Sequence, residues 1–247
     1  MADLNKANRQ TCDVDIRDLK TKKPFLFFDT ANTTTSGLSS ENTYAMAKGS
    51  KRIAFANPLE GTMSIEAQVY PFKLFSLMSD GVIETTAVYA TTQVVTGSEG
   101  SLTITPPGEG TVVEGSVFVY PEESFGDEAT AIDGSFETKT FTAEGVHAST
   151  QYKVGYLVKR TSGIKKITFN NKRTPKDYFV TQSTLDKDEE GVLTPFVMTA
   201  YHAVPQRNFE VAFSSEGDPA TVTVTFDLLE DKDGNVFDMV ELTADAK

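Results

Sequence analysis

The stretch LDKDEEGV, residues 185–192, carries the side chains that a calcium ion would need. It places carboxylates on alternate positions ahead of Gly191. An EF-hand loop requires oxygen ligands at positions 1, 3 and 5, glycine at position 6 and a bidentate glutamate at position 12. Asp186 and Asp188 satisfy positions 1 and 3, but position 12 is Val197. The stretch therefore lacks the ligand that closes an EF-hand site.

A second acidic stretch, FDLLEDKDGNVF at residues 226–237, departs further from that pattern. With Gly234 at position 6, positions 1 and 12 are Leu229 and Val240. Acidic, glycine-containing connections between strands are ordinary turn chemistry. We interpret both stretches as turns, and only Asp186 and Asp188 remain as a weak candidate metal site.

The residues needed for nucleophilic catalysis are sparse. The two histidines are His147, in a polar turn, and His202, in the strand-like run VMTAYHAV, where a half-buried structural side chain is expected. The single cysteine, Cys12, falls in a poorly patterned N-terminal segment, where nothing would hold it beside a histidine. No nucleotide-binding, nucleophile-elbow or zinc-protease motif occurs. We expect neither an enzyme nor a bound cofactor.

Period-two alternation dominates the chain. In TVTVTFDLL, the apolar residues of 222–228 fall on one face and the threonines with Asp227 fall on the other. TMSIEAQVY similarly aligns Met63, Ile65, Ala67 and Val69. Turn residues separate many such runs at the spacing of a sandwich or barrel. The sequence predicts an all-β fold, a β-sandwich or β-barrel.

One short flanking α-helix is predicted within PFKLFSLMSDG, residues 71–81. Pro71 suits a first helical turn, and Gly81 suits a left-handed C-terminal cap. Phe72, Phe75 and Met78 repeat at three-residue steps and give an apolar face. Such a short helix must pack on a sheet to be stable.

We expect a single domain over residues 1–247 with two extended elements. The segment 29–50 is rich in Ser, Thr and Asn and is predicted as a long polar loop, and residues 1–23 are predicted as an extended arm. The acidic region 96–144 is predicted as an elaboration, and 96–110 is the best candidate for a domain boundary.

Charge is distributed unevenly along the 247 residues, whose net charge is −12. Segments 61–150 and 177–247 are each −11, whereas 151–176 is +8. Opposite patches can pair with a neighbouring subunit or within one chain. The acidic balance disfavours tight nucleic-acid binding. The start lacks the apolar core of a secretory signal, and with one cysteine we expect folding in a cytoplasm.

The last third of the chain resembles the major tail proteins, or tail tube proteins, of bacteriophages. The resemblance rests on VPQRNF (204–209), on the SSEGDPA turn (214–220) and on LEDKDGN (229–235), which follows an alternating strand. It is strongest over residues 201–237 and extends more loosely over the whole chain.

This resemblance implies a structural virion protein located in the viral tail and assembled in the host cytoplasm. Its subunits would form hexameric rings that stack into a tube and deliver DNA, without inserting into a membrane. The implied partners are copies of the chain itself, a tape-measure protein during assembly, the tail terminator and baseplate or distal tail proteins, with DNA in transient passage. The alternative is a phage baseplate or adhesin-type β-domain that binds a receptor or glycan.

We expect contacts between subunits to involve the long polar loop, the N-terminal arm and the basic segment. The loop would reach the next ring, and opposite charges would anchor it. The predicted contact residues are Asn32, Thr33, Thr34, Ser39, Glu41, Lys48, Lys51, Arg52, Lys165, Lys166, Lys172 and Arg173.

Overall fold

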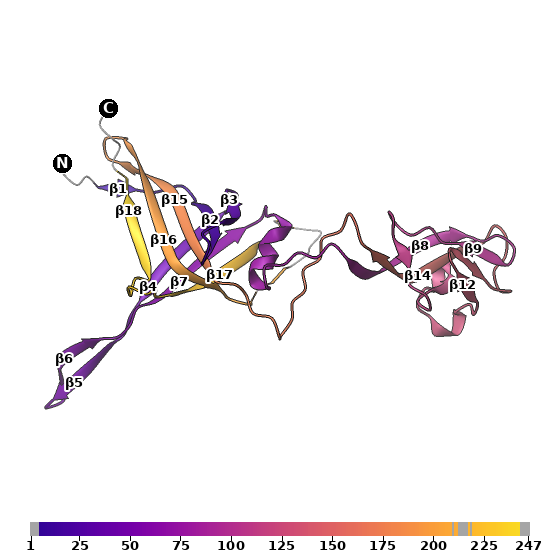
Figure 1. The fold of residues 1–247 in the computed structure, drawn as a ribbon, viewed down its shortest axis with the longest axis horizontal. Coiled ribbons are helices and arrows are strands. Elements are labelled where there is room, and N and C mark those ends of the chain that lie inside the picture. The colour runs from indigo at the N-terminus through magenta and orange to yellow at the C-terminus, as the bar shows by residue number, and fades with distance from the viewer. Residues whose placement is uncertain (1–4, 209, 212–216, 218, 243–247) are drawn as a thin grey trace. The chain divides into compact units, whose positions relative to one another are not determined.

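The fold is described from a computed structural model, which describes residues 5–208, 210–211, 217 and 219–242 (Figure 1). This part of the chain divides into two compact units. Unit 1 comprises Met1–Val82 and Thr168–Lys247, and unit 2 comprises Ile83–Ile167. Phe209, Ser214, Ser215, Glu216 and Asp218, which belong to the motifs quoted above, lie outside the described residues.

Unit 1 is built mainly from strands, as the alternating pattern predicts. Within its described residues the strands are β1 (Lys6–Ala7), β2 (Asp13–Asp18), β3 (Pro24–Phe28), β4 (Thr33–Ser39), β5 (Asn42–Ala47), β6 (Ser50–Ala56), β7 (Glu60–Ala67), β15 (Tyr178–Asp188), β16 (Leu193–Pro205), β17 (Val222–Leu229) and β18 (Phe237–Glu241).

Nine of these strands form one antiparallel sheet in the order β3-β2-β15-β16-β17-β7-β4, with β1 pairing β15 and β18 pairing β16. The sheet curls so that its edge strand β4 approaches β15, since the hydroxyl of Ser36 on β4 donates a 2.9 Å hydrogen bond to the side-chain oxygen of Gln182 on β15. The strands β5 and β6 pair only with each other in a separate two-stranded sheet.

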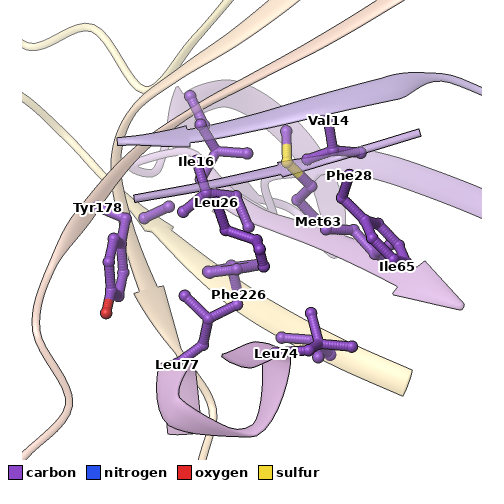
Figure 2. Packing of buried hydrophobic residues seen from close by; sticks show 14 of the residues in the cluster. Val14, Ile16, Leu26, Phe28, Met63, Ile65, Leu74, Leu77, Tyr178 and Phe226 are labelled. Carbon is purple, nitrogen blue, oxygen red and sulfur yellow. The ribbon is translucent and has the colours of Figure 1, made fainter. Parts of the chain in front are cut away.

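The concave side of the curled sheet holds the core of unit 1. Figure 2 shows side chains from β2, β3, β7, β15 and β17 converging there, among them Ile16, Phe28, Met63 and Phe226. Each is at most 1% exposed. Burial of so many large apolar side chains is the main stabilising contribution to this unit. Val69, which the sequence aligns with this face, is exposed because β7 ends at Ala67.

The predicted α-helix is a 3₁₀ helix, η1 (Phe72–Met78). The N–H of Leu74 donates to the carbonyl of Pro71, three residues earlier, at 2.9 Å. A 3₁₀ helix stacks side chains at three-residue intervals. That period suits the sequence here, since Leu74 and Leu77 are buried against the sheet (Figure 2). Gly81 takes the predicted left-handed conformation, with φ of +74°.

Part of the predicted N-terminal arm belongs to the body of the sheet. Val14 and Ile16 of β2 are fully buried, whereas Asp13 and Asp15, which alternate with them, point away from the core. Cys12 is also buried, and desolvation is the main reason that its thiol pKa is raised. The alternation of Val and Ile with Asp in DVDIRD is a strand pattern that the arm interpretation overlooked.

Unit 2 is a small sandwich of two sheets around its own core. Its strands are β8 (Ala87–Thr96), β9 (Ser101–Thr103), β10 (Thr111–Val112), β11 (Phe118–Pro121), β12 (Ser135–Glu137), β13 (Thr140–Thr142) and β14 (Gln151–Arg160), with short 3₁₀ turns η2 (Glu122–Ser124) and η3 (Glu128–Thr130). Strand β14 pairs with β8, β10 and β11, and β13 pairs with β9 and β12. Leu102, Phe141 and Val154 are among the residues buried between the sheets.

The limits of unit 2 differ from the expected organisation. The candidate boundary at 96–110 lies inside unit 2, and the acidic region 96–144 forms most of it. The chain enters and leaves unit 2 through two antiparallel segments. Glu84 and Lys166 exchange two backbone hydrogen bonds of 2.9 Å there, and their side chains form an ion pair of 2.8 Å.

Candidate subunit interface

The segment predicted as a long polar loop forms strands. Strand β4 completes the edge of the large sheet, and β5 and β6 continue beyond it as a hairpin, named here the β5–β6 hairpin (residues 42–56). A hydrogen bond of 3.3 Å from the N–H of Asn57 to the carbonyl of Glu41 closes the base of the hairpin. Threonine is favoured in strands, and Thr33, Thr34 and Thr35 begin β4. The polar composition of this segment therefore does not indicate a loop.

The turn and a bulge fix the shape of the hairpin. Lys48 and Gly49 have φ of +52° and +77°, the backbone signs of a two-residue type I′ turn. The register shifts by one residue between Ala45 and Met46, which leaves Arg52 as the extra residue of a β-bulge. Lys51 places its ammonium group 3.9 Å from the centre of the Tyr44 ring. The predicted cations Lys48, Lys51 and Arg52 are thus gathered on one short hairpin.

Large apolar side chains are exposed on both faces of the β5–β6 hairpin. Tyr44 and Met46 lie on one face, and Ile53 and Phe55 lie on the other. Met46, Ile53 and Phe55 are each more than half exposed. An isolated two-stranded hairpin is marginally stable in water, and contiguous exposed apolar residues mark interaction sites. The hairpin therefore has the features of a docking element.

The sequence predicts KRIAFAN as strand-like, but these apolar residues were not among the predicted contacts, although a signal for the hairpin exists. The run TYAMA alternates, KRIAFAN follows it, and the Lys-Gly pair between them is a turn signal. The other predicted contact residues of this region lie in or beside β4. Asn32 is tied to β7, because its N–H donates to the carbonyl of Glu66 at 2.7 Å. Thr33, Thr34 and Ser39 are part of β4, and Glu41 joins β4 to β5.

The basic segment pairs partly with carboxylates of its own chain. Lys166 binds Glu84 within unit 2, and the guanidinium of Arg173 lies 2.9 Å from the carboxylate of Asp80 within unit 1. Partial burial opposes ionisation of Asp80, but the N–H of Val82 and the guanidinium outweigh it and lower its pKa. Exposed pairs of this kind contribute little stability. Lys165 and Lys172 are exposed.

A polar face covers the outside of β4, β7 and β17. The registers place Thr33, Glu66 and Thr223 in one row, and Thr35, Ser64 and Thr225 in the next. A third row holds Gly37, Thr62 and Asp227. Within these three described strands, no outward-facing residue is lysine or arginine. The face offers hydroxyl groups and negative charge.

The two acidic stretches act as turn formers. Asp188 accepts the N–H of Val192 at 2.7 Å, and Asp231 accepts the N–H groups of Asp233 and Asn235 at 2.9 and 2.8 Å. Asp186, the other weak metal candidate, accepts from the side-chain amide of Asn8 at 2.8 Å. Among the residues that the structure describes, His, Cys, Asp and Glu do not gather in groups of three able to hold a metal.

The histidines occupy structural positions. His202 lies in β16, as predicted, and its Nε2 is 2.9 Å from a carboxylate oxygen of Asp177. The backbone N–H of His147 donates to the hydroxyl of Tyr152 at 2.8 Å in a tight turn of unit 2. No helix within the described residues is long and apolar enough to cross a membrane.

Comparison with known proteins agrees with this architecture. A family model described as the YomU/Tube protein family matches residues 9–241. The chain belongs to this family. The YomU/Tube family is a phage tail tube family, so the resemblance drawn from the C-terminal motifs is confirmed. No curated protein matches the chain. Membership of the YomU/Tube family implies assembly of the chain with itself into a tube.

Proposed function

We propose that the protein is the major tail tube subunit, a structural protein without catalytic residues that polymerises as stacked hexameric rings and forms a conduit for DNA. The proposal depends most on one observation: the β5–β6 hairpin exposes large apolar side chains on both of its faces. The family membership over residues 9–241 supports the tube assignment.

In the proposed tube, the β5–β6 hairpin makes the main contact with another subunit. Its four large apolar side chains become buried there, and Lys48, Lys51 and Arg52 approach carboxylates of the neighbour. Burial of apolar surface provides most of the association free energy, whereas the charges fix orientation. Since Lys166 and Arg173 already bind carboxylates of their own chain, Lys165 and Lys172 are the members of the basic segment proposed to face a neighbour.

The outer face of β4, β7 and β17 is proposed to face the lumen. Hydroxyl groups and carboxylates repel or only weakly hold phosphates, whereas lysine and arginine would bind them and release counterions. A wall of this composition lets a DNA duplex slide. The tape-measure protein, the tail terminator and baseplate or distal tail proteins remain the proposed partners of the assembled tube in the virion, after assembly in the host cytoplasm.

A deletion of the hairpin tests the assembly proposal. Residues 42–56 can be replaced by Asn-Gly, because Glu41 and Asn57 are already hydrogen-bonded and a two-residue turn can join them. We expect the wild-type chain to form tubes in negative-stain electron micrographs and the deletion variant to remain a folded, discrete particle. Tubes formed equally well by the variant would contradict the role of the hairpin.

One observation favours the alternative of a receptor-binding β-domain. On the outer face of the β8–β14–β11 sheet, Phe118 and Phe125 flank Gly155 and line an open groove. A Cβ at Gly155 would meet the ring of Phe125 at 2.9 Å, so glycine lets this ring pack closely against β14. The lining is nearly all apolar, which suits a protein surface better than a glycan. A discrete monomer or trimer in sedimentation at high concentration would favour this alternative.

A further inference from the structure

The second exposed apolar region of unit 1 lies where β1, β15, β16 and β18 come together (Figure 1). We name this region the acidic end. Its apolar members are between 42% and 63% exposed, which is unusual for five large side chains on neighbouring segments. They are Val192, Leu193, Met239, Val240 and Leu242.

Pairing between strands places Leu193, Val240 and Leu242 on one face of the β16–β18 pair, whereas Met239, opposite Met198, lies on the other face at the same end. Val240 of β18 lies opposite Val197 of β16, and the N–H of Leu242 donates to the carbonyl of Pro195 at 2.9 Å. Leu193 lies opposite Lys187 at the start of the β15–β16 pair. The apolar region is therefore held by backbone hydrogen bonds across three strands.

Carboxylates surround the apolar residues of the acidic end. Across the paired segments 6–7, 185–193 and 237–242 there are six acidic and two basic side chains, a net charge of −4. Lys6 binds Glu241, and the side-chain amide of Asn5 donates to Glu189 at 2.9 Å. Glu190 is exposed in the turn. The acidic end thus combines apolar surface with a negative rim.

The β5–β6 hairpin has the complementary composition. It exposes four large apolar side chains, and residues 41–56 carry three basic and one acidic side chain, a net charge of +2. We propose that the hairpin of one copy docks on the acidic end of a second copy. This inference rests on the proposed function. Lys51 and Arg52 lie beside Glu189 and Glu190 of that copy, and the apolar residues of the two surfaces cover one another.

Charge favours the acidic end over the apolar groove of unit 2 as the docking site of the hairpin. Lys153 and Lys159 point to the same side of β14 as Gly155 and Leu157, because side chains alternate along a strand. The groove is therefore flanked by cations, which repel the cations of the hairpin. The outer face of β4, β7 and β17 has the right sign of charge but no large apolar residue before Leu229.

Docking of this kind can be repeated from copy to copy. The β5–β6 hairpin and the acidic end are different surfaces of one unit and lie apart in Figure 1. A contact between two different surfaces is heterologous, so each added copy leaves one hairpin and one acidic end available. Repetition produces closed rings or a filament, as a tube requires.

Charge reversal tests the docking. The hairpin variant Lys51→Glu/Arg52→Glu and the end variant Glu189→Lys/Glu190→Lys are each expected to raise the protein concentration needed for polymerisation at least about tenfold, because like charges then meet. The variant carrying all four substitutions is expected to recover polymerisation. Glu122→Lys/Glu123→Lys in unit 2 is the control whose change of charge equals that of the end variant, and it should polymerise normally.

The outcomes separate this inference from the proposed function. Loss of polymer in the hairpin variant with normal polymer in the end variant would overturn the docking site and leave the tube assignment intact. Failure of the wild-type chain to polymerise under any condition would overturn both. Recovery in the fourfold variant supports the docking.

Cross-linking gives a second readout. Copies carrying Met46→Cys are mixed with copies carrying Val240→Cys and oxidised, while the native Cys12 is buried in the core. We expect a disulfide between the two kinds of copy, and none when Val94→Cys in unit 2 replaces Val240→Cys. Equal cross-linking to both positions would contradict a specific contact.

Discussion

Two buried tyrosines differ in how their hydroxyl groups are satisfied. Within the described residues, the hydroxyl of Tyr178 is buried without a hydrogen-bond partner. Burial, and then the nearby carboxylates led by Asp18, raise its pKa, so the phenol stays neutral. In unit 2, the hydroxyl of Tyr152 accepts from His147 and donates to the carbonyl of Gly145 at 3.2 Å.

Removing these two hydroxyl groups, one at a time, should have opposite effects on the stability of the fold. Tyr178→Phe removes an unsatisfied buried group and is expected to raise the free energy of unfolding by about 1 kcal/mol, whereas Tyr152→Phe breaks two hydrogen bonds and should lower it by about 1 kcal/mol. Thermal unfolding of the two variants checks this. A loss of stability in Tyr178→Phe as large as that in Tyr152→Phe would show that the Tyr178 hydroxyl has a partner.

Asp231 makes the stability of its turn dependent on pH. The N–H of Asn235 is the largest cause that lowers its pKa below the ordinary value of 3.8. The unfolded chain therefore binds this proton more readily, so the carboxylate stabilises the fold above about pH 4 and loses this effect as the pH falls further. The stability difference between wild type and Asp231→Ala should shrink from pH 7 to pH 2. A constant difference over that range would contradict the role of ionised Asp231.

At the scale of elements, the alternating strands could be predicted and two other features could not. Strands such as β7 and β17 have one buried face, so their pattern is visible in the sequence. The β5–β6 hairpin has no buried face in a single chain, so the alternation in TYAMA and KRIAFAN does not show that the two runs pair outside the body of the sheet. The 3₁₀ geometry of η1 depends on how Leu74 and Leu77 pack against the sheet. The three-residue spacing of apolar residues in the sequence is compatible with this geometry but does not determine it.

The face of β4, β7 and β17 gives a prediction about DNA. Glu66→Lys places a cation in the row of Thr33 and Thr223, where the proposed lumen wall has none. Tubes of this variant are expected to retain duplex DNA that is protected from nuclease, and the retention should weaken as salt rises. Wild-type tubes serve as the control. Variant tubes that protect no more DNA than wild type would contradict the assignment of this face to the lumen.

At the scale of the whole molecule, the division into two units was not visible in the sequence. The chain crosses between units at Val82–Ile83 and Ile167–Thr168, where apolar and β-branched residues replace the glycine and proline of a usual linker. The boundary depends instead on pairing between distant residues, Glu84 with Lys166, which no local pattern reveals.

Unit 2 is expected to fold by itself. It has its own buried core, and the Glu84–Lys166 pair joins its two ends. Residues 83–167 expressed alone should unfold in one cooperative thermal transition, and Lys166→Ala should lower the midpoint by a few degrees, about what loss of a surface ion pair of up to 1 kcal/mol causes. Absence of a cooperative transition would show that unit 2 needs unit 1 to fold.

The central claim is that the chain functions through copies of itself. Electron cryomicroscopy of the purified protein at increasing concentration tests it most directly. The account predicts tubes of stacked sixfold rings in which the β5–β6 hairpin of each subunit is buried against another copy. Monomers at every concentration, or tubes whose hairpins face solvent, would contradict it.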